Sequence, residues 1–301
     1  MRIFAAPLII FSPQVNLTTA VTVSPLQGGA VYKSVKFPPP GVSCLAVGRG
    51  GGMSAVHQER SARELLETNQ RFYDALWSGA RLVEAQRFNT WPLVVSLLPE
   101  APWRLEIAPG LRPRLPIEGT QFIDISTPAL SLLRQRGGQV VCGSITDLPY
   151  ADQVFDLVCA LDIIEHVDDD APAWRELARV IKPGAVLLVS VPLHPSRWTP
   201  FDDFVGHRRR YAPQELRARL TEHGFIAERS AVFGMQPRSS RLLDLGMWWL
   251  THHRDRAMWW YNTIFMPLGV FFQRKLKLTT DLQQAEMADE ILLVCRKVQR
   301  Q

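Results

Sequence analysis

The sequence contains only four cysteines in 301 residues, and none of them stands in a C-x-x-C or similar pair. Zinc ribbons and disulfide-stapled scaffolds need such paired spacing, so both classes are excluded, and the sequence predicts no metal site. Cys142, Cys159 and Cys295 each stand in an apolar, strand-like run. We expect these three to be buried free thiols, which is typical of a protein from a reducing compartment.

Acidic residues are absent from residues 1–58, a segment in which proline, glycine, serine and valine are abundant. Breakers such as Pro38–Gly41 interrupt any helical or strand period. We therefore expect residues 1–52 to be disordered and to carry no chemistry. Three interpretations stay open: an over-extended start before Met53, which we favour, an organellar targeting segment, and a faint similarity to a signal peptide at Ile3–Phe11.

A hydrophobic run that would clearly span a membrane is also missing. The uncharged stretch Ala257–Gln273 is marginal in length for a membrane helix, and Pro267 and Gly269 interrupt it. The chain is 47% hydrophobic with a mean hydropathy of −0.03, as in an ordinary globular core. Its net charge of +5 and pI near 9.2 permit an anionic membrane or nucleic acid as a partner without requiring either.

What the chain does have is an alternation of strand-like and helix-like segments from about residue 100 onward. Two of the predicted strands, Trp103–Ile107 and Gln121–Ile125, carry Glu106 and Asp124 near their carboxyl ends. A Pro-Gly turn containing Gly110 follows the first strand. In an open parallel sheet such strand ends meet in one crevice, where a carboxylate is suited to accept both hydroxyls of a ribose.

The remaining elements follow from apolar runs, amphipathic periods and cap residues. We expect strands at Gln139–Cys142, Phe155–Ala160, Ala185–Pro192, Phe225–Phe233 and Glu290–Cys295. We expect helices at Arg87–Leu98, Pro172–Ile181 and Pro213–His223, and one that begins near Ser126.

Six motifs occur in a characteristic order: Glu106…Gly110, Asp124–Ser126, Asp147–Tyr150, Val154–Val158, Glu165–Val167 and Leu177–Gly184. In this order the chain resembles the class I S-adenosylmethionine-dependent methyltransferases, and among them the small-molecule group that includes quinone-biosynthesis enzymes. The resemblance covers about residues 100–232, with a further match at Ala288–Lys297.

The resemblance implies an α/β fold with a doubly wound, mostly parallel, seven-stranded, Rossmann-like sheet whose last strand is antiparallel. Residues 53–100 would form an amino-terminal helical cap. Residues 101–301 would form the methyltransferase domain, with a helical insertion at about 235–287 before the last strand.

The resemblance also implies S-adenosylmethionine as the cofactor, with Asp124 binding both ribose hydroxyls. The cofactor-binding residues that it implies are Glu106, Ala108, Gly110, Asp124, Ile125, Ser144, Ile145 and Leu161. The chain departs from the family pattern at Ala108 and Arg112, which replace two glycines of the turn. It departs again at Ser144, which replaces an aspartate that binds the adenine amino group.

The interval from Glu106 to Asp124 is short for the family, so we expect the first helix to be reduced to a turn. Pro113 and Pro116 agree with this. Arg112 or Arg114 can face the carboxylate of the cofactor, and the alternative is that both arginines are solvated.

Three residues are candidates for catalysis: His166, His207 and Tyr211. The family counterpart of Leu161–Val167 lies beside the sulfonium, so Asp162, Glu165 and His166 are the ionisable groups expected nearest the methyl group. His166 can deprotonate an acceptor hydroxyl, or it is a structural histidine that caps the next helix, since methyl transfer also proceeds by alignment alone. His207 and Tyr211 can bind an anionic or hydroxylated acceptor from a long loop, which can equally be solvated.

Two flanking segments are expected to cover the site. An aromatic stripe along residues 65–77 predicts an amphipathic helix, which either shapes the acceptor pocket or only packs on the core. The tryptophan-rich insertion predicts a helical lid over an apolar substrate. The alternative is a peripheral membrane contact through residues 242–277.

The sequence therefore predicts methyl transfer from S-adenosylmethionine to a small acceptor that is lipid-linked or glycan-related. One alternative is a binding or scaffold protein that has lost cofactor affinity, because two glycines of the turn are replaced. A less favoured alternative is an RNA methyltransferase, since no RNA-binding module is visible and nucleic acid is not an expected partner. No protein partner is evident. We expect a cytoplasmic protein, peripheral to the inner face of the membrane if the insertion contacts lipid.

Overall fold

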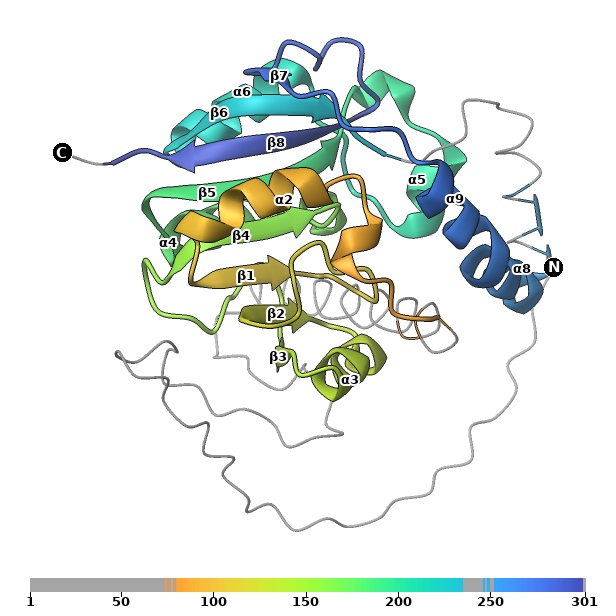
Figure 1. Cartoon of the computed structure of the whole chain (residues 1–301). Coiled ribbons are helices and arrows are strands. Elements are labelled where there is room, and N and C mark those ends of the chain that lie inside the picture. Colours follow the sequence, from red (N-terminus) through yellow and green to blue (C-terminus); the bar gives the residue numbers. More distant parts are fainter. Residues whose placement is uncertain are drawn as a thin grey trace, which may run out of the picture.

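The computed structural model describes residues 74, 77, 80–234, 246, 248, 249 and 252–299. They form one eight-stranded sheet in the order β3-β2-β1-β4-β5-β8-β6-β7 (Figure 1). The strands are β1 (Arg104–Ile107), β2 (Thr120–Asp124), β3 (Gln139–Cys142), β4 (Phe155–Leu161), β5 (Ile181–Pro192), β6 (Phe225–Val232), β7 (Thr279–Thr280) and β8 (Glu290–Lys297).

The first five strands pair in parallel, whereas β8 is antiparallel to both β5 and β6, between which it lies. The predicted doubly wound, mostly parallel sheet with an antiparallel last strand is therefore confirmed. The strand count is eight rather than seven because β7 extends the edge at Arg229 and Ser230 of β6. A strand of two residues is too short to show an alternating pattern in the sequence.

Side chains that alternate along the central strands divide the core into two layers. One layer packs against α4 (Ala171–Val180) and α6 (Pro213–Glu222), and it contains Val158, Ala160, Leu187 and Val189. The other layer lies under α2 (Trp91–Leu97), which Figure 1 shows in front of the sheet, and it contains Leu157, Cys159, Val186 and Leu188. Because both faces are covered, these strands are continuously apolar.

The connection between β1 and β2 has no helix, since residues 108–119, all of them described, run as turns and bends. This confirms that the first crossover is reduced to a turn. The next helix, α3 (Thr127–Gln135), begins after Ser126 with Pro128 in its first turn, as the sequence predicts.

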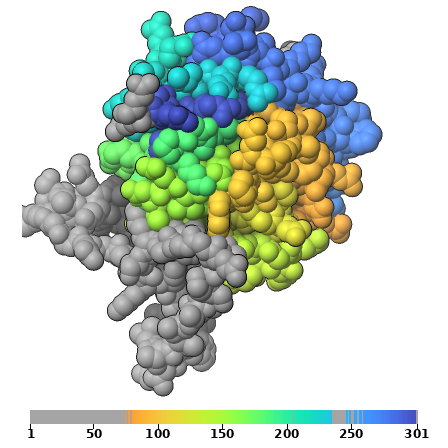
Figure 2. Space-filling view, turned by 60° about the vertical axis from the view of Figure 1, so that its left-hand side comes forward, coloured from red at the N-terminus to blue at the C-terminus, as the bar shows by residue number. Residues whose placement is uncertain are grey.

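The insertion contributes α8 (Arg254–Trp260), the π-helical η5 (Tyr261–Phe265) and α9 (Met266–Phe272) in direct succession. Gln273, which follows α9, binds the amino-terminal segment, because its Oε1 accepts a hydrogen bond from Asn89 N at 2.8 Å. Figure 2 shows the corresponding orange and blue regions in contact. Within the part of the chain that the structure describes, no helix combines the length and apolar character that crossing a bilayer requires.

Asp74 and Trp77 are helical, as the aromatic stripe predicts. The rest of residues 53–79 and the predicted extension, residues 1–52, lie outside the described residues. Cys159 and Cys295 are free and buried, as expected. The prediction of a free thiol is wrong for Cys142, which is disulfide-bonded; it lies in the edge strand β3, which pairs on one side only and leaves it half-buried.

Candidate functional site

Glu106 shapes the turn that follows β1. Its Oε1 accepts a hydrogen bond from Arg114 N at 2.8 Å, and its Oε2 accepts one from Leu115 N at 2.9 Å. The side chain is buried, and this burial raises the pKa of Glu106 to about 7 although both hydrogen bonds oppose the shift. Glu106 thus holds the distal part of the turn against the end of β1.

Asp124 links the ends of β1 and β2. Its Oδ2 accepts a hydrogen bond from Gly110 N at 2.9 Å, and its Oδ1 accepts one from Ser126 N at 2.8 Å. Burial raises the pKa of Asp124 to about 6, against these hydrogen bonds. Each carboxylate oxygen has further acceptor capacity, so Asp124 can still receive two hydroxyl donors. The structure therefore brings Gly110 and Asp124 together, as the sequence predicts for a cofactor crevice.

The turn keeps the left-handed backbone of a glycine turn at Ala108, although alanine replaces a glycine there. Ala108 has φ of 53° and Gly110 has φ of 52°, and the left-handed region is uncommon for alanine. Trp77 packs directly on this turn, because a Cβ placed on Gly110 would lie 2.3 Å from its Cζ2. Arg112 lies 5.0 Å from the Trp77 ring and 5.2 Å from the Tyr261 ring. The helix of Trp77 and the insertion therefore meet beside the turn.

The other predicted cofactor residues lie along the same edge of the sheet. Ile125 follows β2, and Leu161 ends β4; both are half-buried. Ser144 shares a 2.9 Å hydrogen bond with Thr146 through their hydroxyls, and Ile145 is buried in the core. Their roles toward adenine stay predictions.

The catalytic candidates fall into two groups. The rings of His166 and His207 are in edge contact, with centroids 4.8 Å apart. Burial lowers the pKa of His166 to about 3, and His207 and Arg208 add to this shift. Tyr211 is fully buried and its hydroxyl donates to Asp170 Oδ2 at 2.7 Å, while burial raises its pKa above the usual value. This placement favours a structural role for Tyr211 over the catalytic role that the sequence predicts.

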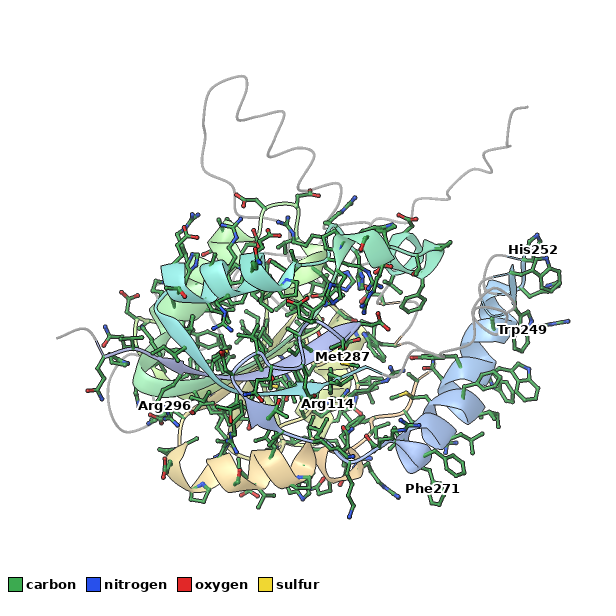
Figure 3. The ribbon with its side chains drawn as sticks, turned by 90° about the horizontal axis from the view of Figure 1, so that it is seen from above. Arg114, Trp249, His252, Phe271, Met287 and Arg296 are labelled. Carbon is green, nitrogen blue, oxygen red and sulfur yellow. The ribbon has the colours of Figure 1, made fainter. Side chains whose placement is uncertain are left out.

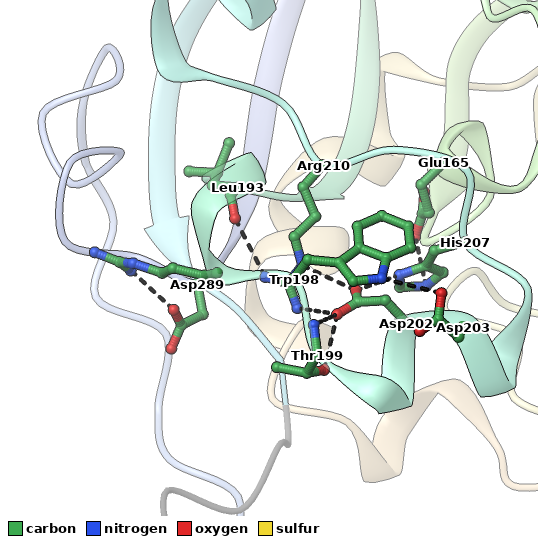
Figure 4. Close-up of polar contacts among 10 residues, drawn as sticks. Glu165, Leu193, Trp198, Thr199, Asp202, Asp203, His207, Arg210 and Asp289 are labelled. Carbon is green, nitrogen blue, oxygen red and sulfur yellow. Dashed lines mark hydrogen bonds and ion pairs between the residues drawn. The ribbon is translucent and has the colours of Figure 1, made fainter.

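Asp202, in α5 (Pro200–Val205), holds both His207 and Arg210 (Figure 4). It accepts two hydrogen bonds of 2.9 Å from Arg210 and one of 2.8 Å between its Oδ1 and His207 Nδ1. Its Oδ2 also accepts hydrogen bonds from the backbone and hydroxyl of Thr199. Burial alone would raise the pKa of Asp202, but these donors outweigh it and hold the pKa below its usual value.

Two further charged residues lie near the site: Arg114, which the sequence offered as a partner for the cofactor carboxylate, and Glu290, which sequence analysis did not single out. Arg114 stacks on Phe88 at 3.7 Å, and burial lowers its pKa against the opposing charges of Asp162 and Glu106. Glu290, the first residue of β8, hydrogen-bonds to Asp162, and burial raises its pKa well above the usual value. An acid at the start of an antiparallel strand gives no local signal, whereas Asp162 stands in a segment whose family counterpart lies beside the sulfonium.

Comparison with known proteins matches residues 119–189 to a family described as a methyltransferase domain. A probable S-adenosylmethionine-dependent methyltransferase of Mycobacterium tuberculosis is 33% identical over 110 residues, which cover 35% of this chain and 39% of that protein. Residues 119–189 thus carry the sequence of a methyltransferase domain.

A demethylmenaquinone methyltransferase of a Mycobacterium species (strain KMS) is 26% identical to this chain over 187 residues. That match covers 54% of this chain and 81% of the relative. A solved methyltransferase structure from Thermotoga maritima aligns with a TM-score of 0.47 at 15% identity, over 81% of this chain and 96% of that one. The match thus spans 39% of the Mycobacterium tuberculosis relative and 81% of the demethylmenaquinone methyltransferase.

A cavity lies at the opposite edge of the sheet. It measures about 540 Å³, and its lining includes Asp156, Lys182 and Arg296. Two of these charges pair with each other, Lys182 Nζ with Asp156 Oδ1 at 2.7 Å, and Arg296 pairs with Glu228. Ligands of open α/β sheets bind at the carboxyl ends of the strands, so we place the site at Asp124 and not here.

Proposed function

We propose that this protein transfers the methyl group of S-adenosylmethionine to a nucleophilic oxygen, nitrogen or carbon atom of a small acceptor. The observation that carries the proposal is the 2.9 Å hydrogen bond between Gly110 N and Asp124 Oδ2, which ties the turn after β1 to the acid after β2. These are the two elements that hold a nucleoside at a doubly wound sheet. The methyltransferase relatives support the same activity.

The residues present fit this cofactor. The left-handed backbone at Ala108 and Gly110 lets the turn approach a ligand closely, and Asp124 has acceptor capacity for both ribose hydroxyls. When bound, the cofactor supplies an electrophilic methyl group, and the protein's task is to align the acceptor with it. His166 follows β4, and its ring contacts that of His207, which lies in the long loop after β5 where the sequence predicts that the acceptor binds.

Calorimetric titration of the full chain with S-adenosylhomocysteine tests the proposal. We expect binding that weakens by about tenfold to hundredfold in Asp124→Asn, because an amide loses the charge that strengthens hydrogen bonds from hydroxyls. Asp152→Asn is the matched control, since that carboxylate is 69% exposed and pairs only with Arg179.

Equal affinity in Asp124→Asn and the unsubstituted protein would contradict the assignment of Asp124. No binding by the folded, unsubstituted protein would favour the alternative of a binding or scaffold protein. Trp77 gives that alternative a physical basis, because its indole covers the turn that the cofactor must approach.

For the acceptor we propose an apolar, lipid-linked compound reached at the surface of an anionic membrane. The support is the exposed aromatic face of the insertion, which projects from the body in Figure 3. Phe271 is 79% exposed and Phe272 is 72% exposed. Exposed basic residues surround this face, namely Arg256, Arg274, Lys275 and Lys277. Aromatic side chains favour the headgroup level of a bilayer, and basic ones favour anionic lipid.

Sedimentation with phospholipid vesicles checks this contact. We expect the protein to bind phosphatidylglycerol vesicles more strongly than phosphatidylcholine vesicles, and high salt to weaken the binding. Replacing Phe271 and Phe272 by serine should abolish most of it. Ile226→Ser is the control, because Ile226 is 60% exposed but lies on β6. The proposal would be overturned if Ile226→Ser lost vesicle binding while the Phe271 and Phe272 double variant kept it. It would also be overturned if the protein showed no preference for anionic lipid.

A further inference from the structure

The segments that carry His166 and His207 bring three side chains that can bind a metal ion to one place. Glu165 and His166 come from η3 (Ile164–His166) at the end of β4, and His207 comes from the loop after α5. One ligand atom from each lies within 4.8 Å of the others. Arg208 N donates to Glu165 O at 2.7 Å, and Arg209 Nη2 donates to Val167 O at 3.0 Å, so the backbone also fixes the two segments together.

Glu165 has a buried carboxylate, one oxygen of which has no hydrogen-bond partner among the described residues. Its side chain is 1% exposed, and its Oε1 lies 3.8 Å from His207 Nε2, too far for a hydrogen bond. Its Oε2 is buried and has no hydrogen-bond partner among the described residues. Burying a carboxylate oxygen without a partner costs several kcal/mol as an order of magnitude, so such an atom calls for a cation or donor.

His207 is held as metal-bound histidines are held. Its Nδ1 is 2.8 Å from Asp202 Oδ1, and a carboxylate neighbour fixes the proton on that nitrogen. The lone pair then lies on Nε2, the atom nearer Glu165. Asp202 cannot turn away, because both its oxygens also bind Arg210. The His166 ring hydrogen-bonds to the backbone of Gly206, so the second histidine has an outer partner too.

We infer that Glu165, His166 and His207 form a binding site for a divalent transition-metal ion such as Zn²⁺, Co²⁺ or Mn²⁺. Two imidazoles and one carboxylate suit these ions, whereas Mg²⁺ and Ca²⁺ prefer oxygen alone. Ligands about 2.0–2.2 Å from a tetrahedral ion lie about 3.4 Å apart, so the three side chains need to close in by about an ångström. Apart from this closing movement, metal binding requires no rearrangement of Glu165, His166 or His207.

The ion would keep at least one open position, since the described residues supply three protein ligands. Asp162, three residues before Glu165, is exposed to solvent and has φ of 51°, a backbone conformation that is uncommon for aspartate. An acceptor oxygen bound at the open position would have a lowered pKa and be a better nucleophile. That role rests on the proposed function, whereas binding of the ion does not.

The test uses the full chain without a histidine tag, stripped with chelator and titrated with Co²⁺. We expect one equivalent of Co²⁺ to give visible d–d absorption bands, and Zn²⁺ to displace it. Glu165→Gln and His207→Gln should each weaken binding by at least about tenfold. His223→Gln is the matched control, because that histidine lies beyond the end of α6 and binds only the Arg219 carbonyl.

Circular dichroism shows which variants fold, and Glu165→Gln preserves the shape of the site if His207→Gln does not fold. Binding that survives both folded variants, or no binding by the unsubstituted protein, would overturn the inference. Titration with S-adenosylhomocysteine runs in parallel. Cofactor binding without metal binding defeats only this inference, and metal binding without cofactor binding defeats only the proposed function.

Discussion

Replacing Asp202 by alanine is expected to lower the free energy of unfolding by about 3–5 kcal/mol. Asp202 is fully buried and receives a bidentate pair of hydrogen bonds from Arg210, which is 4% exposed. Without the carboxylate, the Arg210 guanidinium stays buried with only the Leu193 carbonyl as a partner for Nη1. An uncompensated buried charge is among the few causes of so large a loss.

Urea unfolding followed by circular dichroism measures the loss. Asp203→Ala is the matched control, because Asp203 is the next residue and its carboxylate accepts a hydrogen bond from the exposed Trp198 indole, at 3.0 Å. We expect that change to cost about 1 kcal/mol or less. If Asp202→Ala were no worse than Asp203→Ala, the buried pair would not stabilise the fold. Should Asp202→Ala not fold at all, Asp202→Asn retains the shape and part of the hydrogen bonding.

Gly110→Ala is the second large effect. A side chain at φ of 52° costs about 1–2 kcal/mol, and its Cβ would overlap the Trp77 indole at 2.3 Å, which adds about 1–3 kcal/mol. We expect a total loss of about 2–5 kcal/mol in the free energy of unfolding and weaker binding of S-adenosylhomocysteine.

Two further variants separate strain from overlap. Gly137 has φ of 86° and open space around its Cα, so Gly137→Ala should show the conformational cost alone. In a Trp77→Ala background the overlap is gone, and Gly110→Ala should then cost about as much as Gly137→Ala. An unchanged cost in that background would show that Trp77 does not pack on the turn in solution.

The residues that sequence analysis placed correctly are those governed by local pattern. Gly110 follows an apolar strand and Asp124 ends one. Because parallel strands bring their carboxyl ends to one edge of the sheet, the order of these elements along the sequence is enough to predict that the two residues lie together. The missing crossover helix followed from the short interval and its prolines. The family pattern fixed the antiparallel direction of β8.

What sequence analysis could not supply depends on contacts between distant segments. Glu165 and His207 come from distant segments that the hydrogen bond from Arg208 N to Glu165 O joins, and no local signal marks such a contact. Tyr211 looked like an available hydroxyl because its burial against Asp170 depends on how α4 packs. Trp77 was expected in an aromatic stripe, but its contact with Gly110 depends on where that helix docks.

The place of β8 in the sheet has a consequence for synthesis of the protein. The ribosome makes β8 long after β5 and β6. Yet β8 lies between these two strands and pairs with both, so β8 is the strand that joins them in the sheet. Until it arrives, the edge of β5 offers an unpaired, apolar template of the kind that leads nascent chains to aggregate. β8 also delivers Glu290 to Asp162, so the edge that we assign to chemistry is completed late in translation. A nascent chain stalled before residue 290 should therefore need a chaperone to stay soluble.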